Sequence, residues 1–276
     1  MLEQIDIEKI KSIALEAGEA IMKIYAKDFN IEYKDDKSPL TEADILANEI
    51  ICSALQKLYP LIPLMSEENK ETPYEVRKNW EYYWCIDPID GTKEFIKKND
   101  EFTVNIALIH KDTPVLGVVY APALGELYHA KQGEGAYLSV VDSQWSIVDS
   151  KRLPCYKKDE NVLNVVASKS HLSQETEEFI KNLSTSDKKL STISKGSSLK
   201  LCMVATGEAD IYPRLAPTME WDTAAAHAIV LESGKNVYIY DPNITDYQLA
   251  ASDNRPLAMQ YNKENLLNPW FVVAKW

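Results

Sequence analysis

A run of aromatic and apolar residues at 80–86 ends in Asp87-Pro88-Ile89-Asp90-Gly91-Thr92, and this junction constrains the fold more than any other stretch. The run is typical of a buried strand, and the residues from Thr92 onward favour a helix. We therefore expect the two aspartates on a Pro-interrupted turn between strand and helix. There both carboxylates can reach one hard cation.

The residues that follow the two aspartates suit a phosphate group. Gly91 lets a ligand approach the backbone closely. The amide groups of Gly91, Thr92 and Lys93 at the start of the expected helix form a cradle for phosphate. A metal beside such a cradle indicates metal-assisted phosphoryl chemistry. Asp-Pro and Asp-Gly also form ordinary surface turns, so the motif alone leaves a solvated loop as the alternative.

Composition excludes several classes of protein. At 276 residues the chain can bury a sizeable core, as one large domain or two apposed lobes. Its net charge of -12 disfavours nucleic acid and anionic membranes as partners, because a polyanion would be repelled. An anionic small substrate remains compatible if a metal and a few Lys or Arg side chains reverse the charge locally.

Signal-peptide, transmembrane and cysteine patterns bear on the compartment of the protein, and none of them indicates export. The N-terminus lacks the features of a signal peptide, and no apolar run approaches the ~18 residues of a transmembrane segment. The four cysteines are far apart and show no zinc-site or disulfide spacing, so we expect buried small hydrophobic residues. The default is a cytoplasmic protein, with peripheral association at the inner membrane left open.

Hydrophobic spacing divides the chain into two halves. The first is expected to be α+β, with helices over 7–29 and 41–58 and strands over 61–65, 102–110, 114–122 and 126–130 joined by antiparallel hairpins. The second is expected to be α/β, with strands over 162–167, 190–193, 209–212 and 237–240 and helices over 174–183, 197–205 and 223–232. The polar segment 139–160 separates them, so we expect lobes at 1–145 and 146–276.

Three acidic residues allow both a structural and a functional interpretation. Asp44 lies three residues after the expected N-cap Thr41 and can be a capping carboxylate or part of a site. Glu67 ends a strand, where acids are usually solvated. Asp222 can cap the helix expected from 223, or can bring a carboxylate from a distant segment to a metal site.

Cations and hydroxyl groups of the second half follow strands or begin helices. The segment 195–200, Lys-Gly-Ser-Ser-Leu-Lys, forms a turn at a helix start and could hold a phosphate, although such turns are often only solvated. Arg214 follows a strand, which is where ligands bind in α/β layers. Ser168 and His171 follow the strand over 162–167. His227 is expected to serve packing or to lie at the surface.

Three blocks together resemble a known family. Ser66-Glu67-Glu68, the segment 87–92 and Trp221-Asp222-Thr223-Ala224-Ala225 occur in the order found in the magnesium-dependent, lithium-sensitive phosphatases of the inositol monophosphatase superfamily. The second block matches the DPxDGT signature of that superfamily without a departure. Further runs resemble its branch of bacterial CysQ-type 3'(2'),5'-bisphosphate nucleotidases over nearly the whole chain, at 87–96, 101–107, 116–122, 196–200, 212–214 and 267–269.

The resemblance implies a fold, a metal site and a mechanism. The fold would be a layered αβαβα sandwich of α/β (α+β) class, in two lobes with the site between them. Two or more Mg2+ ions would be held by Glu67, Asp87, the carbonyl of Ile89, Asp90 and Asp222. Oxygen ligands of this kind suit Mg2+. Asp44, Glu67 and Thr92 would be the catalytic residues that orient the attacking water and take its proton.

The resemblance also implies a substrate and its contacts. The chain would remove the 3'-phosphate of adenosine 3',5'-bisphosphate, giving AMP and phosphate, with 3'-phosphoadenylyl sulfate as a further candidate. Substrate contacts would come from Gly91, Thr92, Ser168, His171, Lys195, Gly196, Lys200, Arg214 and Asp222. Inositol monophosphatase or fructose-1,6-bisphosphatase activity is the enzymatic alternative, and a non-catalytic metal or nucleotide sensor is another. The chain would be a monomer or a homodimer.

Overall fold

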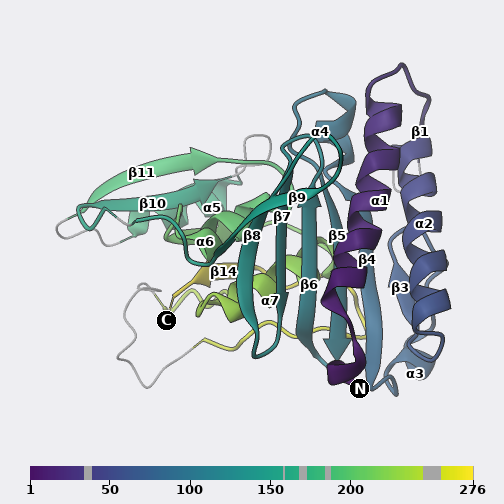
Figure 1. The fold of residues 1–276 in the computed structure, drawn as a ribbon. Coiled ribbons are helices and arrows are strands. Elements are labelled where there is room, and N and C mark those ends of the chain that lie inside the picture. Colours follow the sequence, from purple (N-terminus) through teal and green to yellow (C-terminus); the bar gives the residue numbers. More distant parts are fainter. Residues whose placement is uncertain (34–38, 158, 168–172, 184–187, 245–255, 276) are drawn as a thin grey trace.

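Two stacked β-sheets with helices on and between them form the molecule (Figure 1). The computed structural model describes residues 1–33, 39–157, 159–167, 173–183, 188–244 and 256–275. The layers follow the order helix, sheet, helix, sheet, helix. The αβαβα sandwich that the sequence resemblance implied is therefore confirmed.

The larger sheet has seven strands in the order β3-β4-β5-β6-β7-β8-β9. Its strands are β3 (Leu64–Ser66), β4 (Tyr82–Asp90), β5 (Thr103–His110), β6 (Thr113–Ala121), β7 (Glu126–Lys131), β8 (Gly135–Val141) and β9 (Ile147–Arg152). β3 is parallel to β4, and all other neighbours are antiparallel. The hairpins expected between 102 and 130 are confirmed.

The smaller sheet has five strands in the order β11-β10-β12-β14-β13. They are β10 (Val162–Ala167), β11 (Lys189–Ser194), β12 (Ile211–Arg214), β13 (Asn236–Ile239) and β14 (Phe271–Ala274). β10 is parallel to β11 and β12, whereas β14 is antiparallel to β12 and β13. The expected strands of the second half all belong to this sheet, and β14 is an addition that the sequence analysis missed.

Helices cover both faces of the larger sheet. α1 (Ile7–Tyr25) and α2 (Glu42–Leu58) pack on one face, and α7 (Glu220–Glu232) crosses the other face with α6 (Leu199–Thr206) beside it. α5 (Gln174–Asn182) packs on the far side of the smaller sheet. The short elements are η1 (Leu2–Gln4), β1 (Ile31–Tyr33), β2 (Pro39–Thr41), α3 (Tyr74–Arg77) and α4 (Thr92–Ile96).

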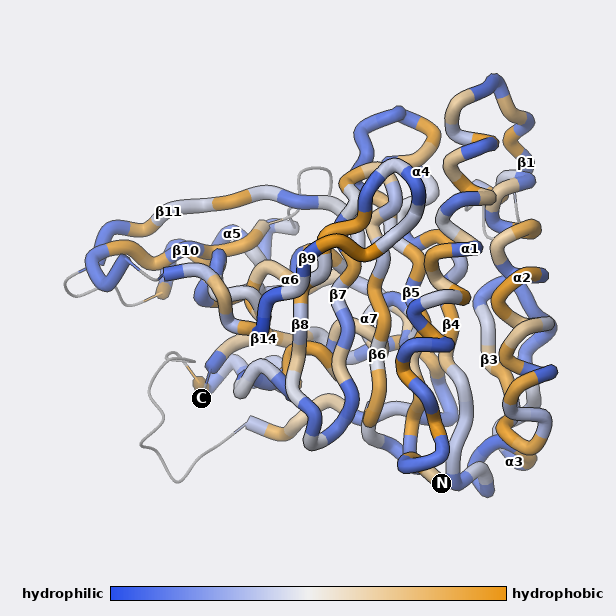
Figure 2. The backbone as a smooth tube through the Cα atoms, in the orientation of Figure 1, coloured by the Kyte–Doolittle hydropathy of each residue, from blue (hydrophilic) through white to orange (hydrophobic). Residues whose placement is uncertain are grey.

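Successive side chains of β4 point to opposite faces of the larger sheet, so the strand packs against the helical layers on both faces. Trp84 and Ile86 belong to the core under α1 and α2, whereas Tyr83 and Cys85 belong to the core shared with α6 and α7. Since both faces are covered, the strand is apolar without a polar alternation. Figure 2 shows hydrophobic stretches along the central strands and hydrophilic loops at many of their ends.

The expected boundary between the halves needs a correction. The segment 139–160 is not a polar linker, because β8 continues through Val141 and β9 pairs with it in a hairpin. β9 is an exposed edge strand, so its sequence is polar and lacks the hydrophobic signal. A division at 145/146 would cut this hairpin, and the change of sheet comes between Arg152 and Val162. We retain two lobes as a proposal with the boundary moved there.

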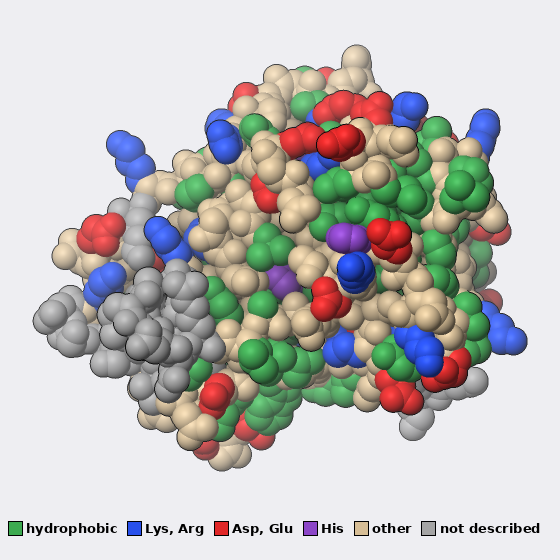
Figure 3. All heavy atoms as spheres, turned by 90° about the horizontal axis from the view of Figure 1, so that it is seen from below, with side chains coloured by type: hydrophobic (Ala, Val, Ile, Leu, Met, Phe, Trp, Pro, Cys, Tyr) green, Lys and Arg blue, Asp and Glu red, His purple; other side chains and the backbone are tan. Residues whose placement is uncertain are grey.

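Surface features agree with a compact acidic protein. Acidic and basic side chains are interspersed over the face drawn in Figure 3. None of the helices in the described ranges is long and apolar enough to cross a membrane.

Cys85 and Cys202 are buried as expected, whereas Cys52 and Cys155 are only partly buried. His227 is buried and contacts Tyr261 and Asn236, which confirms a packing role.

The contact between α7 and β6 depends on one glycine. A Cβ atom on Gly117 would lie 2.1 Å from the carbonyl oxygen of Ala225. The backbone of α7 therefore rests directly on β6. This close approach fixes the depth at which α7, with Asp222 in its first turn, docks on the larger sheet.

Gly117→Ala is expected to lower the free energy of unfolding by about 3 kcal/mol, because the methyl group meets backbone atoms that cannot move aside. Gly234→Ala is the control: nothing lies within 4 Å of its Cβ position, and only its φ of 80° is unfavourable. We expect it to cost about 1 kcal/mol. Urea denaturation of both variants measures the difference, and equal losses would contradict the close approach.

Candidate functional site

The two aspartates of the opening motif lie on the last residues of β4, and not on a turn after it. The strand continues through Asp90, and its pairing with β5 shifts register between Asp87 and Asp90. The expected Pro-interrupted turn is therefore wrong, and a bulge takes its place. A bulge tolerates Pro88, which has no N–H for the sheet. The chain turns one residue later, at Gly91, where φ is 93°.

A third aspartate from the other half of the chain joins them. Carboxylate oxygens of Asp87, Asp90 and Asp222 all lie within 4.8 Å of one another. Asp222 comes from the first turn of α7, which begins at Glu220 and thus three residues before the expected start. Asp87 Oδ1 is buried and has no hydrogen-bond partner among the described residues. An orphaned buried carboxylate oxygen of this kind suits a cation.

Asp90 and Asp222 each have one carboxylate oxygen that accepts hydrogen bonds within the fold. Asp90 Oδ2 accepts from the Ser197 hydroxyl at 2.6 Å and from the Ser198 amide at 2.5 Å. Asp222 Oδ2 accepts from the Met219 amide at 2.8 Å, as a first-turn acid does. In each case the other oxygen is left for a ligand, so the structural and functional interpretations of Asp222 are compatible.

The cluster is electrostatically unfavourable without a cation. Burial raises the pKa of Asp87 well above its usual range, and the charges of Glu67, Asp90 and Asp222 raise it further. Burial, followed by the charge of Asp90, raises the pKa of Asp222 to about 8. The pKa of Asp90 is also raised by burial, although Lys200 opposes that shift. A divalent cation would remove this repulsion, and the all-oxygen donor set fits Mg2+.

Asp44 reaches both the start of α2 and the residue after Gly91. Its Oδ2 accepts from the Thr41 amide at 2.8 Å and the Thr41 hydroxyl at 2.6 Å, which completes a capping box. Its Oδ1 accepts from the Thr92 hydroxyl at 3.3 Å. The same hydroxyl lies 3.2 Å from the carbonyl oxygen of Ile89. The capping residue Asp44 thus also holds the Thr92 hydroxyl, which contacts the Ile89 carbonyl between Asp87 and Asp90.

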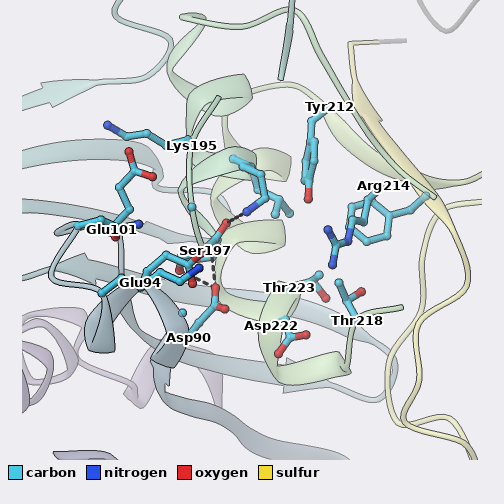
Figure 4. A pocket seen from close by; sticks show the side chains of 18 residues that line it. Asp90, Glu94, Glu101, Lys195, Ser197, Tyr212, Arg214, Thr218, Asp222 and Thr223 are labelled. Carbon is cyan, nitrogen blue, oxygen red and sulfur yellow. Dashed lines mark hydrogen bonds between the residues drawn. The ribbon is translucent and has the colours of Figure 1, made fainter. Parts of the chain in front are cut away.

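A cavity of about 350 Å3 opens beside the cluster. In Figure 4, Asp90 and Asp222 lie along one side of it, whereas Lys195, Tyr212 and Arg214 lie along the other. The predicted residues that line it are Asp90, Gly91, Lys195, Gly196, Lys200, Arg214 and Asp222. Asp90 and Asp222 form its acidic side, and Lys195, Lys200 and Arg214 form its basic side, although Glu94 and Glu101 line the cavity near those cations.

Lys200 is the most buried cation of this cavity. It is 8% exposed, and burial lowers its pKa to about 8. Its Nζ donates to the Ser197 carbonyl oxygen at 2.7 Å. Arg214 ends β12, as expected, and its Nε is buried without a partner among the described residues. Both side chains have donors available for an anion.

Other predicted residues lie elsewhere or outside the described ranges. Within those ranges, the cavity lining does not include Asp44, Glu67, Asp87, Ile89 or Thr92. Ser168 and His171 fall outside the described residues. Gly196 also has a packing reason, since a Cβ there would lie 2.8 Å from the carbonyl oxygen of Glu101. α4 has only five residues, so any phosphate cradle at Gly91 depends on its amides more than on a helix dipole.

Several lining residues were missed in the sequence analysis. Ser197 and Ser198 contact Asp90 directly, although only the glycine and lysines of their segment had been singled out. The remaining additions are Glu94, Lys97, Asn99, Glu101, Leu201, Tyr212, Thr218, Thr223 and Phe271. The Gly-Ser-Ser turn was a usable signal for the serines, because short hydroxyl side chains at a helix start commonly bind anions or carboxylates. The other residues are brought together only by the tertiary fold.

Comparisons with known proteins find relatives that match nearly the whole chain. The model of the inositol monophosphatase family matches residues 1–269. The 3'(2'),5'-bisphosphate nucleotidase CysQ of Salmonella typhimurium is 43% identical over 97% of this chain and 99% of its own length, and that of Escherichia coli K12 is 40% identical over the same shares. The crystal structure of CysQ from Bacteroides thetaiotaomicron is 43% identical, covers 97% of both chains and has a TM-score of 0.80.

Asp87→Asn is expected to stabilise the metal-free protein. At pH 8 in EDTA the variant should gain about 2 kcal/mol in free energy of unfolding, because it removes a buried charge from a repulsive cluster. Because its raised pKa makes protonation easy as pH falls, the wild-type carboxyl destabilises less at lower pH. The gain should therefore shrink at pH 6.

Denaturation at both pH values, with and without Mg2+, tests this expectation. Mg2+ should stabilise the wild type and have little effect on Asp87→Asn. Asp28→Asn removes one exposed carboxylate and controls for net charge. A variant that is less stable than the wild type in EDTA at pH 8 would contradict the electrostatic interpretation.

Proposed function

The chain belongs to the inositol monophosphatase family, and we propose that it is a Mg2+-dependent 3'(2'),5'-bisphosphate nucleotidase. It would hydrolyse the 3'-phosphate ester of adenosine 3',5'-bisphosphate to AMP and phosphate, with 3'-phosphoadenylyl sulfate as a second candidate substrate. We further propose two or more Mg2+ ions per site and inhibition by Li+. The relatives that carry the nucleotidase name match this chain from end to end, which supports the activity.

The two-sided charge of the cavity is the observation that carries this proposal. A phosphate ester next to the aspartate cluster would have its charge balanced by bound metal. Lys200 donates to the Ser197 carbonyl and Arg214 Nη2 to the Pro217 carbonyl, and the remaining donors of both side chains would be available to a second anionic group. A substrate with two separate phosphates uses both sides, whereas a monophosphorylated polyol uses only one. The cavity therefore favours a substrate with two phosphates, and the nucleotidase names of the relatives favour a nucleotide over fructose 1,6-bisphosphate.

The chain's own residues would divide the work of the reaction. Asp87, Asp90, Asp222, Glu67 and the Ile89 carbonyl would hold the metal ions. Bound Mg2+ would supply Lewis-acid activation of a water molecule and charge neutralisation at the phosphate.

Proton transfer and positioning would come from the first lobe. The Asp44 carboxylate fixes the Thr92 hydroxyl, and that hydroxyl together with Glu67 would orient the attacking water. Glu67 would accept its proton as general base. The Gly91 and Thr92 amides would bind the equatorial phosphate oxygens, on which charge is spread in the transition state. If the residues have these roles, Thr92→Val should lower kcat and leave the aspartate cluster intact.

Phosphate release from three substrates separates the candidate activities. Adenosine 3',5'-bisphosphate, inositol 1-phosphate and fructose 1,6-bisphosphate are assayed in parallel with Mg2+, with and without Li+. We expect the nucleotide to be preferred and Li+ to inhibit. Preference for a sugar phosphate would support inositol monophosphatase or fructose-1,6-bisphosphatase activity. Mg2+ and nucleotide binding without release would support a sensor.

Lys200→Ala tests the basic side of the cavity. It should reduce kcat/KM for the bisphosphate by roughly 30-fold, since a charge-assisted hydrogen bond contributes about 2 kcal/mol, and should affect inositol 1-phosphate far less. Lys78→Ala, an exposed lysine outside the cavity lining, is the control. An equal loss for both substrates would remove the argument for a second phosphate site.

A further inference from the structure

Two buried polar residues lie on β5 directly opposite two aspartates of the cluster. In the register of the sheet, Thr103 faces Asp90 and Asn105 faces Asp87. Both are at most 1% exposed, in a strand that is otherwise almost wholly apolar. They do not line the described cavity and make no contribution to the mechanism above. Burying a polar group costs desolvation free energy, so such a group needs a hydrogen-bond partner. The partners of Thr103 and Asn105 connect both residues to the aspartate cluster.

The partners are the two serines that had not been assigned a role. Thr103 Oγ1 lies 2.6 Å from Ser197 Oγ and 2.8 Å from Ser198 Oγ. Asn105 Nδ2 donates to Thr103 Oγ1 at 3.2 Å, and Asn105 Oδ1 accepts from Ser198 Oγ at 2.8 Å. Each side chain in this group therefore has a partner inside it, and the group connects β5 to the start of α6.

The direction of these hydrogen bonds is set by Asp90. The Ser197 hydroxyl donates its single proton to Asp90 Oδ2. Ser197 Oγ then accepts from Thr103, whose own oxygen accepts from Asn105. The result is a chain of donors that runs from Asn105 through Thr103 and Ser197 to the carboxylate. Consecutive donors of this kind polarise one another and strengthen the bond to the acceptor.

Ser197 adopts a backbone conformation that needs such support. Its φ is 53°, in the left-handed region that non-glycine residues rarely occupy. Strained residues of this kind persist where their surroundings hold them, and they gather at functional sites. The same residue offers its carbonyl oxygen to Lys200 Nζ at 2.7 Å. One residue thus contacts a metal-site carboxylate through its side chain and the main buried cation through its backbone.

We propose that Thr103, supported by Asn105, is a positioning residue that holds Ser197 between Asp90 and Lys200 and so couples metal binding to nucleotide binding. Thr103 itself touches neither ligand. Its hydroxyl fixes the Ser197 side chain on Asp90, which leaves Asp90 Oδ1 for the cation. Because Lys200 is held by the same serine, occupation of either side of the cavity favours the geometry needed by the other. This inference rests on the proposed function.

Mg2+ titration by calorimetry, with and without 5'-AMP, tests the proposal in four proteins. Thr103→Val keeps the shape and removes the hydroxyl, and should weaken Mg2+ binding about tenfold, as loss of a partner behind a metal ligand does. It should also reduce the factor by which AMP strengthens Mg2+ binding. Thr103→Ser restores the hydroxyl and should bind within about twofold of the wild type. Thr206→Val removes a buried threonine hydroxyl at the far end of α6 and should leave Mg2+ binding unchanged.

A second variant keeps the test decisive if Thr103→Val folds poorly. Ser197→Gly removes the donor to Asp90 but relieves the left-handed strain, and because these effects on stability oppose each other its melting temperature in EDTA should stay within about 4 °C of the wild type. Its Mg2+ affinity should nevertheless fall about tenfold. Lys111→Gly, at an exposed residue with a φ of 57°, shows the effect of strain relief alone.

The outcomes separate this inference from the proposed function. Absence of Mg2+ binding by the wild type would overturn both. Metal-dependent nucleotide hydrolysis by the wild type, with Thr103→Val or Ser197→Gly binding Mg2+ as the wild type does, would overturn the inference alone. An equal loss in Thr206→Val would assign the effect to general destabilisation and would also overturn it.

Discussion

Repulsion among carboxylates, one buried and two half-buried, is the constraint on which the rest of this structure depends. Asp87 and Asp90 come from one strand and Asp222 from a helix more than a hundred residues later, yet their oxygens lie within 4.8 Å. Such a cluster costs free energy in the absence of a cation. It therefore persists only because the surrounding fold is rigid enough to impose it. The direct contact between the α7 backbone and Gly117 on β6 is part of that rigidity.

The fold holds these acids by giving single oxygens structural roles. Asp44 closes the capping box of α2, Asp222 accepts from the backbone before α7, and Asp90 accepts from the start of α6. A carboxylate has two oxygens, so a structural hydrogen bond to one leaves the other available. The question whether such an acid is a helix cap or a functional residue then has no single answer. Here the cap is the means by which the functional oxygen is positioned.

How much of this could be predicted from the sequence depended on burial and on distance along the chain. Strands β4 to β7 were found because both of their faces are covered and most of their residues are apolar, whereas the exposed edge strand β9 ends in the polar residues Asp-Ser-Lys-Arg. Helices were found with errors of a few residues at their ends, such as Phe29 against Tyr25 for α1. Capping at Thr41 and Asp44 was predicted correctly because it is local.

The site itself is formed by contacts that no local pattern encodes. Spacing along the chain could not bring Asp222 to Asp87; its position at a helix start left a distant metal site open as one alternative, and the family resemblance favoured it. The resemblance in turn did not reveal Thr103 or Asn105, since a polar residue inside a strand has no meaning until its partner across the sheet is known. The same holds for the basic side of the cavity. In a chain with a net charge of -12, we propose that buried Lys200 and half-buried Arg214 attract an anion because the fold places both cations in one cavity beside the aspartate cluster. Their position in that cavity would make local charge, and not net charge, decide which ligand it accepts.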